Sequence, residues 1–250
     1  MSVDSSAAMA GASLSVALES VAAEDLFVLG RKATAARRAR LGDRATFVRS
    51  RQLLATGAWR GPRDAAVSYI EEEDLAALGG WPVARDAGVG LLVGGRSVEA
   101  HRAAHADGAR SLWRLAFRAD EGEAARLSRI VELRRLVEAG LPIWGVLPTP
   151  DGEAQGLDTL RVIALCRLGL PAIAHVLVEV ATLGPRLAQM SMGFGADEIF
   201  APIVSERALR VGDNARNPSM TRKEAAIFIR GAGLVPCERL GGEELEEVAS

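Results

Sequence analysis

Short apolar runs alternate with longer amphipathic segments along most of the chain. The apolar or β-branched runs span residues 45–49, 65–70, 89–93, 112–117, 143–147, 172–180 and 198–204. Several of them are continuously apolar, which is typical of parallel strands that helices cover from outside. The pattern therefore predicts buried strands joined by helical connections.

The segments between these runs carry signals for helix ends. A helical pattern that begins near Val16 closes, after a basic stretch, at Gly42. The other expected boundary residues are Gly140 as a stop, Asp158 as an N-cap, Pro185 in a first turn after Gly184, and Thr221 with Glu224 as a capping box. Helices and strands thus follow one another in βα order.

About seven βα units predict an α/β protein with a (βα) barrel of the TIM type, complete or slightly short, with N-terminal helices. The alternative is an open doubly wound sheet, although no GxGxxG motif follows the first strand. With 250 residues the chain fits one large domain. We expect a disordered Ser/Ala/Gly-rich segment at 1–14, one barrel domain at 15–240 and an acidic tail at 241–250.

The composition of the chain limits the partners and the cellular compartment that we expect. The formal net charge is -2, which gives no reason to expect nucleic acid or a membrane surface as a partner. No apolar run reaches the ~18 residues of a membrane span, and the N-terminus lacks the basic start of a signal peptide. The sequence has only 2 cysteines, too few for a disulfide scaffold. We expect a cytoplasmic protein.

In a barrel of this type, chemistry is found at the carboxyl ends of the strands. Gly94, Gly95 and Arg96 could hold an anion there with backbone amides and a guanidinium, although a βα turn capped by Ser97 has the same sequence. The residues that we expect to converge on one rim, around a small anionic ligand, are Arg49, Arg51, Gly94, Gly95, Arg96, His175 and Glu179.

Other polar residues have two interpretations each. The acidic run from Glu71 to Asp74 could supply paired carboxylates, but an acidic first helical turn is favoured. His175 could pair with Glu179, but a satisfied core histidine is favoured. His101 and His105 have the i, i+4 spacing of metal ligands, but without a third ligand a solvated helix face is favoured. No metal site is expected, and Cys166 is interpreted as a small hydrophobic residue.

Two separated blocks of the chain resemble a known family in order and spacing. The first block covers residues 41–51, and the second extends back to residues 104–108. The second includes the segments 156–168, 172–176, 183–184, 187–189, 194–198 and 232–239. Together they are similar to the radical SAM enzymes of futalosine-dependent menaquinone synthesis, namely aminofutalosine synthase and dehypoxanthine futalosine cyclase. The related enzymes that make the deazaflavin cofactor are similar too.

The chain departs from this family at its cluster motif. The resemblance implies a CxxxCxxC loop after the first strand, where three thiolates hold a 4Fe–4S cluster that binds S-adenosylmethionine. The corresponding stretch, residues 52–64, contains no cysteine, and Cys166 and Cys237 lie on other elements. The chain is also short by about one βα unit relative to the family barrel. We therefore expect no 4Fe–4S cluster, no binding of S-adenosylmethionine and no radical SAM activity.

Among the positions that match the family, Asp197, Glu206 and Arg239 are the polar ones, and we expect them to brace an end of the barrel. The resemblance implies a non-radical pseudoenzyme, a ligand-binding protein or a partner protein near menaquinone synthesis. As a partner it would form a homo-oligomer or a complex with an active radical SAM paralogue. The alternative is a cofactor-free enzyme acting on a nucleoside- or chorismate-derived carboxylate intermediate, which Arg49, Arg51, Arg96 and His175 would bind.

Overall fold

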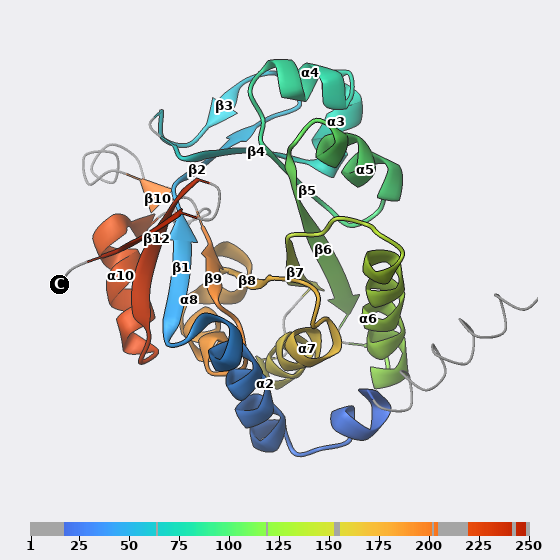
Figure 1. Ribbon diagram of the computed structural model, residues 1–250, viewed down its shortest axis with the longest axis vertical. Helices are drawn as coiled ribbons and strands as arrows, with labels where there is room; N and C mark the ends of the chain where they lie inside the picture. Colours follow the sequence, from blue (N-terminus) through green and yellow to red (C-terminus); the bar gives the residue numbers. More distant parts are fainter. Residues whose placement is uncertain are drawn as a thin grey trace, which may run out of the picture.

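The computed structural model describes residues 18–63, 65–118, 120–152, 156–201, 203–204, 220–241 and 244–248 (Figure 1). The segment expected to be disordered, 1–14, and Glu206 lie outside these residues. The helices are α2 (Leu26–Leu41), α3 (Glu72–Leu78), α4 (Trp81–Asp86), α5 (Val98–Ala106), α6 (Glu123–Glu138), α7 (Gly156–Gly169), α8 (Val180–Met192) and α10 (Arg222–Gly231). None of these helices is long and apolar enough to cross a membrane.

The strands form one large curled sheet and a two-stranded one. They are β1 (Arg44–Val48), β2 (Ser50–Leu53), β3 (Trp59–Arg60), β4 (Val67–Glu71), β5 (Leu91–Gly94), β6 (Arg110–Arg118), β7 (Gly145–Asp151), β8 (His175–Glu179), β9 (Glu198–Phe200), β10 (Ile203–Val204), β11 (Met220–Thr221), β12 (Val235–Gly241) and β13 (Glu244–Glu247). The large sheet has the order β13-β12-β1-β9-β8-β7-β6-β5-β4-β2-β3, and β10 pairs with β11. Within the large sheet only β3 and β13 pair antiparallel.

The curl of the large sheet follows from its connections. Strands β1 and β2 stand third and tenth in the order, yet only Arg49 separates them along the chain. The two ends of the sheet must therefore approach each other, and Figure 1 shows the strands arranged around a ring with helices outside. This confirms the expected α/β fold of the barrel type over an open doubly wound sheet.

Each of the seven predicted runs contains an observed strand, but the sequence did not indicate β2, β3, β11, β12 or β13. Strand β12 was missed because Glu238 and Arg239 interrupt its apolar pattern. Strand β13 lies in the segment expected to be an acidic tail, and it pairs with β12. Both strands carry charged side chains that are buried or paired in tertiary contacts. The periodicity of apolar residues along the sequence gives no sign of such contacts.

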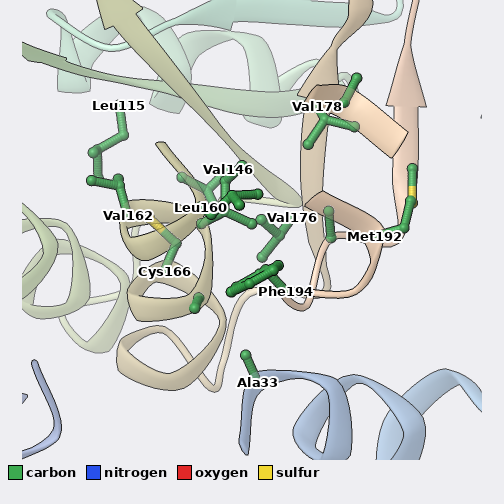
Figure 2. Packing of buried hydrophobic residues seen from close by; sticks show 14 of the residues in the cluster. Ala33, Leu115, Val146, Leu160, Val162, Cys166, Val176, Val178, Met192 and Phe194 are labelled. Atoms are coloured by element: carbon green, nitrogen blue, oxygen red, sulfur yellow. The ribbon is translucent and has the colours of Figure 1, made fainter. Parts of the chain in front are cut away.

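Buried side chains fill the inside of the curl and the layer between sheet and helices. The inner cluster contains only residues from strands, namely Leu91, Val93, Leu112, Leu147, Leu177 and Phe200. In the outer layer, Figure 2 shows Leu160 and Cys166 of α7 packed with Val146 and Val176 from neighbouring strands. Cys166 is fully buried there, which confirms its interpretation as a small hydrophobic residue.

Helix ends follow the sequence signals with one exception. Thr221 and Glu224 form the expected capping box at the start of α10. Gly184 has a non-helical φ of 71°, so α8 is kinked and its second part starts at Pro185, as expected. The expectation for Asp158 is wrong, because this residue lies within the first turn of α7, where its carboxylate faces Arg126 at 3.2 Å.

Candidate functional site

Arg114 on β6 is the centre of a polar cluster inside the curl, at the carboxyl ends of the strands. Its Nη2 donates to Oε1 of Glu71 at 2.9 Å, and its Nη1 donates to Thr149 Oγ1 at 3.2 Å and to Glu179 Oε2 at 3.4 Å. Thr182 also donates to Glu179. The side chains therefore come from four parallel strands or their ends. We call this cluster, with Gln52 and Tyr69, the mouth of the barrel.

Strand alternation places these residues on the inner face. On β4, Ile70 packs in the cluster beneath α3, α4 and α5, so Tyr69 and Glu71 point to the opposite side. On β6, Leu112 belongs to the inner cluster and Arg114 is two residues further on the same face. The sequence signal for Arg114 is a charged residue in phase with inward apolar residues on the same strand, and Arg114 was not among the expected site residues.

The charge on Glu71 is poorly compensated. Burial raises the pKa of Glu71 to about 7. The charge of Arg114 lowers this pKa, but the charges of Glu179 and Glu73 act in the same direction as burial. The first-turn interpretation holds for Glu72, Glu73 and Asp74 in α3, whereas Glu71 ends β4 and belongs to the mouth. Burial also raises the pKa of the Tyr69 phenol well above its usual range.

Two hollows adjoin the cluster, and both are lined by Gln52 and Glu71. The larger one has a volume of about 610 Å³ and reaches Glu72, Glu73 and the segment from Val93 to Arg96. The smaller one, about 140 Å³, is lined by Arg60, Tyr69, Glu179 and Phe200 among others. The rings of Tyr69 and Phe200 pack edge to face with centroids 5.3 Å apart. The mouth therefore offers charged, hydrogen-bonding and aromatic surface to a small molecule.

The glycine turn after β5 lines the larger hollow, but the chain supplies its own anion there. The backbone amide of Arg96 donates to Oε2 of Glu72 at 3.0 Å. A Cβ at position 94 would lie 2.2 Å from that oxygen, so Gly94 is needed for the close approach of Glu72. Ser97 caps α5 by accepting from Ala100 N at 3.1 Å. The turn was expected to bind an external anion, but the carboxylate of Glu72 already accepts from its backbone.

Arg49 and Arg51 do not reach the mouth. Arg51 is in register with Ser68, its Nε donates to Ser68 Oγ at 2.9 Å, and its guanidinium lies 4.1 Å from the centre of the Trp59 ring. Arg49 Nε donates to Glu238 Oε1 at 2.5 Å. The expected convergence is wrong for both arginines. On β2 the strand alternation turns Arg51 to the face opposite Gln52, and Arg49, between β1 and β2, pairs with Glu238 away from the mouth.

His175 lies at the opposite end of the barrel from Glu179. It is the first residue of β8, so it is at the amino end of the strand, and its Nδ1 is 2.5 Å from Asp197 Oδ2. Its Nε2 is 3.3 Å from Nη2 of Arg239. The expected rim position of His175 is therefore wrong, and its interpretation as a satisfied core histidine is confirmed.

The surroundings of His175 form a buried network at the floor of the barrel. Asp197 also accepts from Arg167 and from the amide of Val176, while Arg239 Nη2 donates to Glu198 Oε2 at 2.8 Å. Burial opposes the charge of Asp197, but the hydrogen bond from His175 and the charge of Arg167 outweigh it and lower the pKa of this carboxyl. As expected, Asp197 and Arg239 brace an end of the barrel.

The paired histidines of α5 differ in their surroundings. His105 is exposed, as expected, but His101 is fully buried and its ring lies 5.1 Å from that of Trp113. The solvated-face interpretation is therefore wrong for His101. Within the described ranges, no group of three His, Cys, Asp or Glu side chains is arranged to hold a metal ion.

The cysteines do not fit a thiolate-held cluster. Cys166 lies on α7 and Cys237 on β12, both buried, and the chain after β1 has no cysteine up to residue 63. Burial raises the pKa of the Cys166 thiol to about 12, which disfavours the thiolate that iron needs. No chemistry of such a cluster can be assigned to these residues.

Comparison with known proteins agrees with the sequence resemblance. No family model matches the chain. The chain is 30% identical over 156 residues to aminodeoxyfutalosine synthase of Thermus thermophilus, covering 57% of this chain and 42% of that protein. It is 31% identical over 87 residues to cyclic dehypoxanthine futalosine synthase of Streptomyces coelicolor, covering 35% of this chain and 21% of that protein. The aligned regions thus span less than half the length of these relatives.

Solved structures show the same fold. Methylornithine synthase superposes with a TM-score of 0.61 at 12% identity, covering 90% of this chain and 94% of that one. The hydrogenase maturase HydG of Carboxydothermus hydrogenoformans gives 0.57 at 11% identity, covering 94% and 80%. The chain is therefore related to the radical SAM enzymes of the futalosine pathway and shares a barrel fold with these structures.

Proposed function

We propose that this relative of the futalosine-pathway radical SAM enzymes is a non-radical barrel protein that binds a small polar ligand at its mouth. The observation that carries the proposal is the convergence of Arg114, Glu71 and Glu179 from three strands beside two hollows. Convergent polar groups in a concavity are the usual mark of a ligand site. The relatives suggest that the ligand is a compound of the futalosine pathway.

The non-radical part of the proposal rests on the stretch after β1. In this stretch β2 and β3 form a hairpin, with Leu53 opposite Trp59, and no residue of it is a cysteine. We propose that the protein holds no 4Fe–4S cluster and does not use S-adenosylmethionine. Anaerobic reconstitution with iron and sulfide is expected to give no stoichiometric iron. Bound cluster together with cleavage of S-adenosylmethionine would contradict this.

Ligand binding can be tested with the compounds named by the relatives. Aminodeoxyfutalosine and cyclic dehypoxanthine futalosine are added to the full chain in a thermal-shift assay. At least one is expected to raise the melting temperature of the wild type, and Arg114→Gln should abolish this ligand-induced shift. Arg118→Gln is the matched control, because Arg118 pairs with the exposed Asp120 outside the mouth. An equal shift in Arg114→Gln would place the ligand elsewhere.

The distribution of apolar side chains on the surface favours the ligand-binding hypothesis over the partner-protein hypothesis. Among the described residues, the large exposed apolar side chains come from five helices and three strands, namely Phe27, Val83, Leu157, Met190 and Ile227 on helices and Trp59, Leu240 and Leu245 on strands. A docking face requires a contiguous patch, whereas the mouth already gathers its polar groups in one place.

A cofactor-free enzyme is the second candidate, favoured by one observation. The pKa of Glu71 is about 7, which suits a group that both accepts and donates a proton near neutral pH. Of the residues expected to bind a carboxylate intermediate, only Arg96 lines a hollow beside the mouth. Turnover of either compound by iron-free protein, lost in Glu71→Gln, would support the enzyme. Binding without turnover would support the binding-protein hypothesis instead.

A further inference from the structure

The mouth lacks one positive charge. Among the described residues, Arg114 is the one guanidinium that pairs with both Glu71 and Glu179. The side chains of Arg114, Glu71 and Glu179 are only 24%, 16% and 20% exposed. Two carboxylates and one guanidinium leave a net negative charge in a place where water screens it poorly. A ligand that enters the mouth meets this charge.

Both carboxylates also keep acceptor capacity. Glu71 is bonded through Oε1, and Glu179 through Oε2, which accepts from Arg114 and Thr182. Among the described residues, the second oxygen of each carboxylate has no hydrogen-bond partner. Both residues line the smaller hollow. Donors from a ligand would therefore satisfy acceptors that the protein leaves open.

Among the described residues that line the two hollows, the other charged groups do not reverse this balance. Arg60 lines the smaller hollow and Arg96 the larger one, but both are exposed, so water screens their charges. Glu72 and Glu73 line the larger hollow and add negative charge. A negatively charged ligand group placed between Glu71 and Glu179 would be repelled by these two carboxylates.

One wall of the smaller hollow is aromatic. Tyr69 and Phe200 both line it and pack edge to face at 5.3 Å. Such a wall suits a ring or a short hydrocarbon part of a ligand, next to the two carboxylates.

We propose that the mouth binds a small primary amine as its ammonium ion between Glu71 and Glu179, with a ring against Tyr69 and Phe200. This inference rests on the proposed function, since it names the ligand chemistry of the same site. It replaces the anionic ligand expected from the sequence.

The titration of Glu71 supports the inference. Burial, Glu179 and Glu73 raise its pKa to about 7 against the effect of Arg114. Below this pH a proton supplies the missing positive charge, and an ammonium ion must displace it. Amine binding should therefore release a proton near pH 7 and strengthen as the pH rises from 6 to 8.

The test uses three probes that differ in one group, namely benzylamine, benzyl alcohol and benzoate. Each is titrated into the full chain at pH 8 by ligand-observed NMR. Benzylamine is expected to bind at least about tenfold more tightly than benzoate, with the alcohol between them. Glu179→Gln should weaken benzylamine about tenfold and leave benzyl alcohol unchanged. Glu132→Gln, an exposed substitution on α6, is the control and should change neither.

The outcomes separate this inference from the proposed function. Tighter binding of benzoate than of benzylamine would overturn the amine while leaving the mouth as a binding site. Failure of all three probes to bind would count against both. Glu71→Gln is the second variant in case Glu179→Gln does not fold. Benzylamine binding that neither variant weakens would overturn the inference.

Discussion

Nη2 of Arg114 lies 2.9 Å from Oε1 of Glu71, although the two residues are 43 positions apart in the chain. They stand on β6 and β4, with β5 between these strands in the sheet. Strand β5 ends at Gly94, and the backbone of Gly95 lies directly against the carbonyl oxygen of Arg114. The contact joins the βα units of β4 and β6 at the mouth, across the unit of β5.

Replacing Arg114 tests how far the mouth depends on its guanidinium. Arg114→Met leaves Glu71 and Glu179 without their shared partner. We expect the free energy of unfolding to fall by about 1–3 kcal/mol at pH 8, less than for a fully buried pair because the site is partly exposed. The loss should be smaller at pH 5, where Glu71 is protonated. Urea denaturation at both pH values measures this, and equal losses would contradict it.

The raised pKa of Glu71 predicts a pH dependence of stability. Its pKa is about 7 in the folded protein against an ordinary value of 4.5, so the folded state binds more protons between these values. Stability from this group is present below pH 4.5 and is lost as the pH rises toward 7. The loss is at most about 3 kcal/mol. Glu71→Gln should remove this part of the slope in urea denaturation, and an unchanged slope would contradict the prediction.

Gly95 and Gly90 form a matched pair of glycines around β5. A Cβ at position 95 would lie 2.1 Å from the carbonyl oxygen of Arg114, whereas a Cβ at position 90 has no atom within 4 Å. Gly95→Ala should destabilise the protein by about 1–3 kcal/mol and displace Arg114, because backbone has to move. Gly90→Ala should be neutral or slightly stabilising. Thermal denaturation compares the two, and similar melting temperatures would show that the turn after β5 adapts freely.

Asp197 is expected to be a purely structural residue. Its carboxylate accepts from Arg167, His175 and the amide of Val176, and it is 1% exposed. Asp197→Asn should cost about 3–5 kcal/mol in chemical denaturation, because Arg167 is left buried without its counter-ion. Where the variant folds, ligand binding at the mouth should be retained. A small loss of stability, or a loss of binding in folded protein, would show another role.

The capping box of α10 gives a local test. Thr221 Oγ1 accepts from the amide of Glu224 at 3.1 Å, and Glu224 Oε2 accepts from the amide of Thr221 at 2.7 Å. Thr221→Ala should lower the free energy of unfolding by about 0.5–2 kcal/mol. Thr221→Ser keeps the hydroxyl and should cost little. If both variants lose the same amount, the loss comes from the buried methyl group and not from the cap.

The sequence by itself determined the seven apolar strand segments and the helices between them, the barrel type of fold and the start of α10. These features depend on local patterns, since apolar periodicity and capping involve residues a few positions apart. The sequence also showed the relationship to the futalosine-pathway enzymes, through blocks such as 156–168, and the absence of cysteine from residues 52–64.

Only the tertiary structure decided which polar residues meet. Arg51 and Gln52 are neighbours in the sequence, yet one contacts Ser68 and the other lines the mouth, because successive side chains on a strand point to opposite faces. His175 and Glu179 share a strand, but its length places them at opposite ends of the barrel. Glu72 meets Arg96 across 24 residues. The curl of the sheet brings these residues together. The pattern of apolar and polar positions along the chain does not show in which direction the sheet curls.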